Sequence, residues 1–183
     1  MVETLDFSLS IFNFIDIASL ELRLFIFSIN LNIFRLGEEM NKLLIGDGGM
    51  GSELRFRGVE VPSHIESIWS ALALTTNTQI IKEVHFDYIE AGAQYITANN
   101  YAVTQPILER ADLADQLEDL TLLSLSIARD AIKESGKDIK LAASLPPLET
   151  SYRADLILDY SKMYDQYQEL ASILEGEVDI IIC

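Results

Sequence analysis

From Met40 onward, short apolar runs alternate with longer amphipathic stretches, and this alternation limits the possible folds more than any other feature of the chain. The runs have the length of strands, and the stretches between them space apolar residues three or four positions apart, as helices that cover a sheet do. No hairpin dipeptide lies between two runs, which favours parallel strands joined by crossover helices. The candidate strands are Lys42–Gly46, Gln94–Thr97, Ile139–Ser144 and Val178–Cys183.

Three of the intervening stretches have helical periodicity, and each is followed by a glycine: Gly92, Gly136 or Gly176. Glycine commonly follows the last turn of a helix because it tolerates the left-handed conformation. The capping-box spacing of Ser63–Glu66 predicts a further short helix that carries Trp69. The three apolar stripes are Ile80, Ile81, Val84 and Tyr88; then Leu113, Leu117, Leu120, Ser124, Ile127 and Ala131; then Leu156, Tyr160, Met163, Tyr167, Leu170 and Leu174.

This order of elements predicts an α/β fold with about four βα units, which is half of a (β/α)8 TIM barrel. Such barrels typically need about 250 residues, whereas this chain has 183. The chain also ends within an apolar run, Asp179–Cys183, without a turn or a polar cap. We therefore expect the N-terminal half of a barrel, truncated at the C-terminus; a small doubly wound sheet is the alternative.

Residues 1–39 differ from the remainder, because they are rich in Phe, Ile, Leu and Ser and contain no glycine before Gly37. The uncharged stretch Leu24–Phe34 is too short to span a membrane, and no basic region precedes it as in a signal peptide. We predict an N-terminal appendage outside the barrel over residues 1–39 and a partial barrel domain over residues 40–183.

The net charge of −16 argues against nucleic acid and membrane surfaces as partners, since both attract basic proteins. The single cysteine, Cys183, excludes an internal disulfide and cannot by itself form a thiolate-rich zinc site. We expect a cytoplasmic protein in which Cys183 is a small buried apolar side chain.

A carboxylate and several glycines follow the first candidate strand, in the string Asp47-Gly48-Gly49-Met50-Gly51. Glycine permits positive φ angles and a close approach of the backbone to a ligand. Enzymes with parallel barrels place their functional groups at the carboxyl ends of the strands. We therefore expect Asp47 to lie at a binding site, although an Asp-Gly pair also marks many ordinary turns.

Four strings, taken in order, resemble the homocysteine S-methyltransferase family over residues 42–183. They are Asp47–Leu54; Val84–Tyr88 with Ala91–Ala93; Ile96–Thr104; and Ala143–Pro147 with Ser151–Arg153. The similarity is to the short, cobalamin-independent, zinc-dependent members. Ala98 and Asn100 stand where threonines are common in that family.

The resemblance implies methyl transfer from a sulfonium donor, S-methylmethionine or S-adenosylmethionine, to the thiol of homocysteine, as in methionine biosynthesis. It also implies a zinc ion held by three cysteine thiolates, which ionises the substrate thiol. Those cysteines are not in this chain, so we predict no metal ligands and no activity for it alone. The residues implied to bind homocysteine are Asp47 at the ammonium group, Gly48, Gly49 and Met50 at the floor, and Asn99 and Tyr101 at the mouth.

Two other functions stay open, namely a methyltransferase that uses betaine or a cobalamin-bound methyl group, and a non-catalytic truncated half barrel. His64 and His85 lack the neighbours of a metal pair, and we expect His85 to form a hydrogen bond between a helix and the sheet. We expect packing roles for Trp69, Tyr88 and Tyr95, and a solvated face for Asp112, Asp115, Glu118 and Asp119.

Overall fold

The computed structural model describes residues 43–62, 68–149 and 154–183. The chain divides into two units, Met1–Leu43 and Leu44–Cys183, and the helices and strands named here belong to the second unit. The predicted appendage over residues 1–39, His64, the capping segment Ser63–Glu66 and the string Ser151–Arg153 lie outside the described residues.

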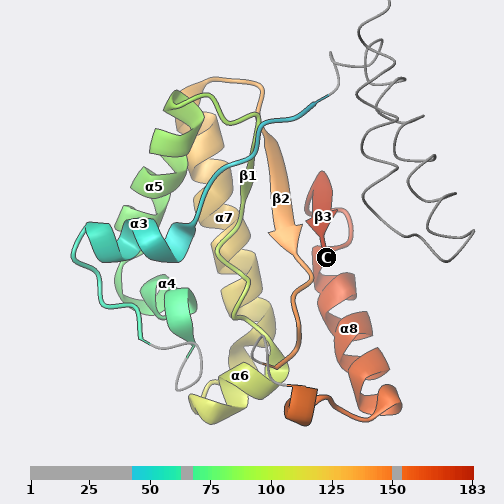
Figure 1. Cartoon of the computed structure of the whole chain (residues 1–183). Coiled ribbons are helices and arrows are strands. Elements are labelled where there is room, and N and C mark those ends of the chain that lie inside the picture. The colour runs from blue at the N-terminus through green and yellow to red at the C-terminus, as the bar shows by residue number, and fades with distance from the viewer. Residues whose placement is uncertain (1–42, 63–67, 150–153) are drawn as a thin grey trace, which may run out of the picture. The chain divides into compact units, whose positions relative to one another are not determined.

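The described residues contain one sheet of three parallel strands in the order β1-β2-β3 (Figure 1). The strands are β1 (Tyr95–Thr97), β2 (Lys140–Ser144) and β3 (Ile180–Ile182). In the register, Tyr95 lies opposite Lys140 and Ala142 lies opposite Ile180. The prediction of an α/β fold with parallel strands is confirmed, and three of the four candidate strands are present.

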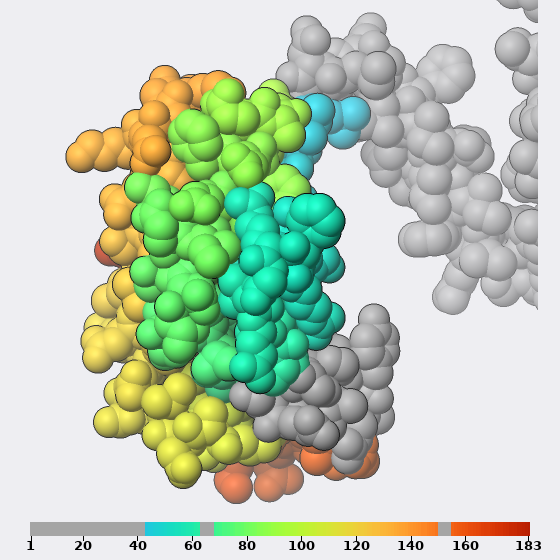
Figure 2. Space-filling view, turned by 90° about the vertical axis from the view of Figure 1, so that its left-hand side faces the viewer, coloured from blue at the N-terminus to red at the C-terminus, as the bar shows by residue number. Residues whose placement is uncertain are grey.

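Helices connect the strands and cover the sheet (Figure 1). The path from β1 to β2 contains α6, η3 and α7, and the path from β2 to β3 contains η4 and α8. In the space-filling view, α3 lies directly against α5, and it also contacts η2 (Figure 2). The bounds are α3 (Met50–Phe56), η2 (Trp69–Ala71), α4 (Leu72–Thr76), α5 (Thr78–Glu90), α6 (Gln105–Arg110), η3 (Ala114–Gln116), α7 (Leu117–Ser135), η4 (Ala154–Leu156) and α8 (Tyr160–Leu174).

The stripes of α5 and α7 become the packed layer on one face of the sheet. The predicted stripe of α8 is correct only in part, because Leu170 and Leu174 are buried whereas Tyr160 is exposed. The buried residues of α5 are Ile81, Val84, His85 and Ile89, which places the stripe slightly to one side of the predicted one. The glycine predicted to end α7 does so, because Gly136 caps the helix with φ of 64°. The acidic residues of the predicted solvated face are exposed: Asp112, Asp115, Glu118 and Asp119.

The first candidate strand, Lys42–Gly46, is wrong as a strand for its described residues, since Leu43–Gly46 has no regular structure. Ile45 accepts a backbone hydrogen bond from Gln94 at 2.7 Å, but its own N–H donates to the Gln94 side chain at 2.9 Å. A side chain therefore takes the place of a main-chain partner. Leu44 and Ile45 are 46% and 64% exposed, so this run is not the buried strand that its composition suggested.

Two single-residue expectations are also wrong. His85 is fully buried, yet neither ring nitrogen has a hydrogen-bond partner among the described residues. Without a partner, burial lowers the pKa of His85 from 6.5 to about 4. Cys183 is exposed rather than buried, because β3 leaves its end uncovered by described residues.

No helix in the described part of the chain is long and apolar enough to cross a membrane.

Candidate functional site

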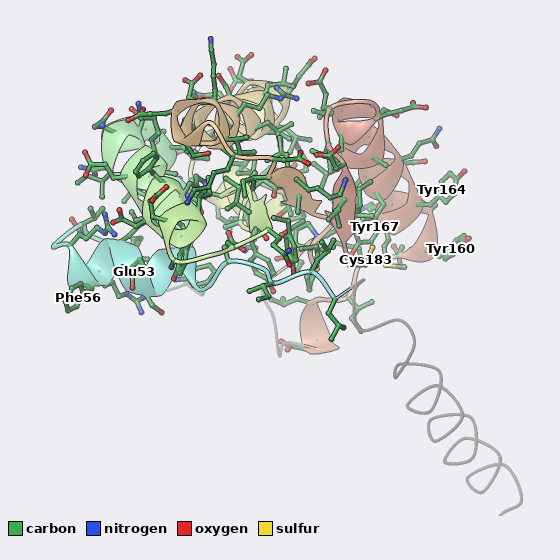
Figure 3. All side chains as sticks on the ribbon, turned by 90° about the horizontal axis from the view of Figure 1, so that it is seen from above. Glu53, Phe56, Tyr160, Tyr164, Tyr167 and Cys183 are labelled. Atoms are coloured by element: carbon green, nitrogen blue, oxygen red, sulfur yellow. The ribbon has the colours of Figure 1, made fainter. Side chains whose placement is uncertain are left out.

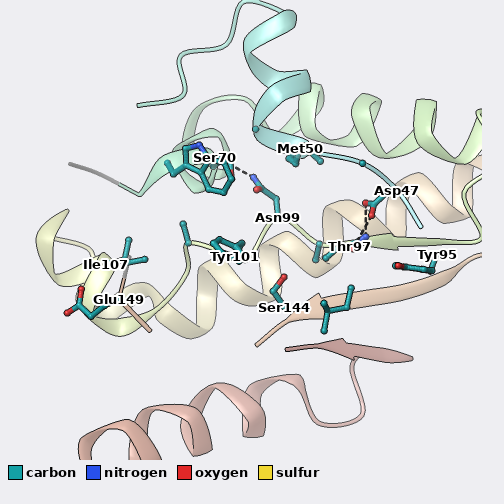
Figure 4. A pocket seen from close by; sticks show the side chains of 16 residues that line it. Asp47, Met50, Ser70, Tyr95, Thr97, Asn99, Tyr101, Ile107, Ser144 and Glu149 are labelled. Carbon is teal, nitrogen blue, oxygen red and sulfur yellow. Dashed lines mark hydrogen bonds between the residues drawn. The ribbon is translucent and has the colours of Figure 1, made fainter. Parts of the chain in front are cut away.

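A cavity of about 610 Å³ opens at the carboxyl ends of the three strands (Figure 4). Thr97 ends β1, Ser144 ends β2 and Ile182 ends β3, and all three contribute to its wall. The other lining residues come from β1, from the loops that follow β1 and β2, from the segment before α3, and from α3, η2 and α6: Asp47, Gly48, Met50, Gly51, Trp69, Ser70, Tyr95, Ala98, Asn99, Tyr101, Ala102, Ile107 and Glu149.

The Asp47 carboxylate is fixed by the last residue of β1. The Thr97 backbone N–H donates to Oδ2 at 2.8 Å, and the Thr97 hydroxyl donates to Oδ1 at 3.0 Å (Figure 4). Burial raises the pKa of Asp47 above its usual value, while both bonds from Thr97 act in the opposite direction. Each carboxylate oxygen can accept more than one bond, so Asp47 keeps capacity for a ligand.

The glycines after Asp47 allow close packing of neighbouring side chains and do not adopt an unusual backbone conformation. Gly49 has φ of −72°, and neither Gly48 nor Gly51 has a positive φ, so the predicted positive φ angles are wrong. A Cβ at Gly48 would lie 2.7 Å from the Tyr88 hydroxyl, and one at Gly51 would lie 3.0 Å from the Trp69 ring. These glycines let aromatic side chains approach the backbone of the loop.

Two consecutive asparagines follow β1 and are both buried. Asn99 donates to the Ser70 carbonyl at 2.9 Å and so holds η2 against the cavity. Asn100 donates to the Ser144 carbonyl at 2.8 Å and accepts from the Ser144 N–H at 2.9 Å, which joins the ends of β1 and β2. The Tyr101 ring meets the Trp69 ring edge to face, with centroids 5.9 Å apart.

The loop after β2 is attached to α6 at two points. The Thr104 hydroxyl donates to the Leu148 carbonyl at 2.6 Å, and Arg110 forms an ion pair with Glu149. Through these contacts Glu149 becomes part of the cavity wall.

Most of the predicted site residues are brought together, because the cavity wall contains Asp47, Gly48, Met50, Asn99 and Tyr101. Gly49 is exposed and lies outside the wall. Sequence reasoning assigned Trp69 and Tyr95 to packing and overlooked Glu149. For Glu149, its position just beyond the third predicted strand end was an available signal.

The charge of the wall is negative. Among the described residues that line the cavity, Asp47 and Glu149 are the acids, and none is Lys, Arg or His. Such a wall suits ligands that carry a positive group.

The residues present do not fit the zinc site that the family resemblance implies. The chain has one cysteine, and no group of three His, Cys, Asp or Glu side chains within residues 43–62, 68–149 and 154–183 is placed to hold a metal ion. A three-thiolate site needs more cysteines than this sequence contains.

The fold and the cavity define a class: an α/β protein with parallel strands and a ligand-sized cavity at their carboxyl ends. The family model described as homocysteine S-methyltransferase matches residues 44–183. This chain belongs to the homocysteine S-methyltransferase family.

Individual relatives agree with this assignment. Homocysteine S-methyltransferase 1 of Zea mays is 35% identical over 92 residues, which cover 50% of this chain and 28% of that protein. Homocysteine S-methyltransferase of Escherichia coli (strain K12) is 37% identical over 91 residues, covering 49% of this chain and 28% of that protein.

A solved structure is similar over a longer stretch. The homocysteine methyltransferase MmuM from Escherichia coli, in the form named as metallated, matches with a TM-score of 0.66 and 26% identity. The match covers 80% of this chain and 55% of MmuM. This chain thus spans about half of that solved relative, and its alignments cover just over a quarter of the two curated relatives.

Proposed function

We propose that this chain is part of a homocysteine S-methyltransferase in which the cavity binds homocysteine and a sulfonium donor, either S-methylmethionine or S-adenosylmethionine. The observation that carries the proposal is the Asp47 carboxylate, held by Thr97 in the wall of a cavity at the carboxyl ends of parallel strands. An anionic oxygen in this position forms a charge-assisted hydrogen bond with an amino acid's ammonium group.

Each of the other site residues has a role in this proposal. Gly48 and Met50 form the floor beside Asp47, and their backbone groups are available to the substrate carboxylate. Gly49, which lies outside the cavity wall, has no role in binding in this proposal. Asn99 holds η2 in place, and Tyr101 closes the mouth against the Trp69 ring.

The proposed reaction is an in-line displacement. The homocysteine sulfur, after losing its proton, forms a new S–C bond to the donor's methyl group. The bond from that methyl group to the sulfonium breaks, and its electron pair stays on the donor sulfur, which becomes a neutral thioether. Such a step depends on positioning and on exclusion of water more than on an acid or a base.

For the architecture, we propose that residues 40–183 form half of a (β/α)8 barrel and that residues 1–39 lie outside it. The support is the set of three parallel strands joined by helices, together with coverage of 55% of MmuM. We also propose a cytoplasmic location for the protein.

Direct tests are homocysteine binding and methyl transfer. Asp47→Asn preserves the shape of the side chain and an acceptor for Thr97 but removes the charge, so we expect homocysteine affinity to fall about tenfold. Asp115→Asn, which removes an exposed carboxylate outside the cavity, is the matched control. Unchanged affinity in Asp47→Asn would exclude the assigned role.

Methyl transfer is measured on this chain and on a version extended to the genomic stop codon, with zinc supplied. We expect transfer from S-methylmethionine only in the extended form. Transfer from betaine or from methylcobalamin instead would replace the proposed donor.

One observation favours a second candidate, a non-catalytic half barrel: the chain's one cysteine cannot form a three-thiolate metal site. Inactivity of both versions, with every donor, would favour that candidate.

A further inference from the structure

The cavity contains a second carboxylate, which the proposed homocysteine site does not use. Glu149 and Asp47 lie at opposite ends of the cavity, with Ser70, Asn99 and Tyr101 between them (Figure 4). A cavity with an acid at each end can hold two positive groups at once.

Glu149 is held in a defined orientation. Its side chain is 18% exposed, and Arg110 Nη1 donates to Oε2 at 2.5 Å. The adjacent Leu148 carbonyl accepts from the Thr104 hydroxyl, so both the backbone and the side chain of this turn are attached to α6. This attachment lowers the conformational entropy that Glu149 would otherwise lose when it binds a ligand.

The ion pair leaves acceptor capacity on Glu149. Arg110 contacts one carboxylate oxygen, whereas an ionised carboxylate has about four acceptor positions. Arg110 is not among the residues that line the cavity. Glu149 is therefore the member of the ion pair that belongs to the cavity wall.

The volume is compatible with two small ligands. About 610 Å³ falls within the roughly 300–1,000 Å³ of sites that enclose a drug-sized molecule. Two amino acids could lie end to end, with one ammonium group at Asp47 and the other at Glu149. Their sulfur atoms would then meet in the middle of the cavity.

We propose that Glu149 binds the α-ammonium group of the methyl donor, with Arg110 as the residue that positions it. This assignment rests on the proposed function and adds to it the end of the cavity at which the donor binds. The competing explanation is that the Arg110–Glu149 ion pair only attaches the loop after β2 to α6. The two explanations differ because only the first predicts that loss of the Glu149 charge weakens binding of the donor.

The experiment is a titration of this chain followed by ligand-observed NMR, which measures weak binding without turnover. S-methyl-L-methionine is titrated in the presence of saturating homocysteine, so that the Asp47 end is occupied. We expect Glu149→Gln to weaken S-methyl-L-methionine about tenfold or more and to leave homocysteine within about twofold. Asp47→Asn is expected to have the opposite pattern.

Three controls separate recognition from structure. Glu109→Gln removes an exposed carboxylate of the same helix α6 outside the cavity and should change neither affinity. Glu149→Asp keeps the charge on a shorter stem and should recover part of the loss. Dimethylsulfoniopropionate has a sulfonium but no ammonium group, so Glu149→Gln should not weaken it.

The outcomes also separate this inference from the proposed function. If homocysteine binds but Glu149→Gln leaves S-methyl-L-methionine unchanged, or weakens dimethylsulfoniopropionate equally, the assignment of Glu149 is overturned and the homocysteine site stands. If the wild-type chain binds neither homocysteine nor S-methyl-L-methionine, the proposed function itself fails. Circular dichroism of each variant shows whether the fold is retained.

Discussion

The two consecutive helix–strand units, α7–β2 and α8–β3, have similar sequence patterns but differ in how far they are buried. Eight residues of α7 are buried, whereas α8 buries only Leu170 and Leu174. Tyr160 and Tyr164 of α8 are 76% and 56% exposed and extend away from the helix (Figure 3).

The difference follows from the number of neighbours. α7 packs against α5 on one side and against α8 on the other, while in the described part of the chain α8 packs chiefly on α7. β3 likewise has one neighbouring strand, and its Ile181 and Ile182 are partly exposed. A periodic apolar stripe shows which face of a helix can be buried, but the neighbouring elements decide how much of it is buried.

The largest expected effect lies in the inner unit. Leu125 of α7 is fully buried, so Leu125→Ala removes its packing and leaves a cavity that should cost about 2–5 kcal/mol of unfolding free energy. Leu123→Ala, on the exposed side of the same helix, should cost well under about 1 kcal/mol. Chemical denaturation measures both, and equal losses would contradict the contrast between the two faces.

The second prediction concerns the stability of the folded protein as a function of pH. It depends on His85 of α5, the helix that packs against α7. The pKa of His85 is lowered from 6.5 to about 4 in the folded protein, so folding favours the neutral ring. Its contribution is fully present above pH 6.5 and is lost as the pH falls towards 4. The loss amounts to at most about 3.5 kcal/mol, since the pKa is lowered by about 2.5 units and each unit corresponds to roughly 1.4 kcal/mol.

His85→Leu isolates this contribution, because it removes the titrating ring together with two buried nitrogens that have no partner among the described residues. We expect the stability of His85→Leu to fall less than that of the wild type between pH 7 and pH 4.5, as measured by denaturant unfolding at each pH. Parallel pH profiles for the two proteins would show that the ring is hydrated or paired in solution.

The third effect concerns the join between β1 and β2. Asn100→Ala leaves the buried N–H and carbonyl of Ser144 without their side-chain partner, which should cost about 2 kcal/mol. Asn100→Asp still accepts from the Ser144 N–H but places a carboxylate against the Ser144 carbonyl. Its deficit relative to wild type, measured by thermal unfolding, should shrink as acid protonates that carboxyl group.

The sequence was sufficient to predict the inner elements of the fold. Alternating runs and stripes located β1, β2 and α7, and Gly136 marked the end of α7, because these features depend on local spacing. The run before Asp47 failed as a predicted strand because composition does not distinguish a paired strand from a segment whose N–H group at Ile45 donates to the side chain of Gln94.

The candidate site was predictable in its motif residues and not in its tertiary contacts. The position of Asp47 after an apolar run indicated the edge of a sheet, and the cavity wall includes it. Trp69 and Glu149 enter the wall through contacts with residues distant in sequence, such as Tyr101 and Arg110. For Trp69, no spacing rule within its own segment carries that information, whereas Glu149 could have been found from its position just beyond a predicted strand end.

The smallest expected effect returns to the outer unit. The rings of Tyr160 and Tyr164 stack with centroids 6.4 Å apart, but both are largely exposed, so little apolar area leaves water when they meet. Tyr164→Ala removes that contact and gains a few tenths of a kcal/mol in helix propensity, so the net change should be below about 0.5 kcal/mol. Leu170→Ala, on the buried side of the same helix, should cost several times more and serves as the matched control.

Denaturant unfolding at two protein concentrations measures the loss for Tyr164→Ala. A loss above about 1 kcal/mol that grows with concentration would mean that the stacked pair is covered in an assembly. In that case α8 would be covered by a second molecule in the assembly, as α7 is covered by α5 and α8 within the chain. The difference in burial between α7 and α8 would then hold only for the isolated molecule.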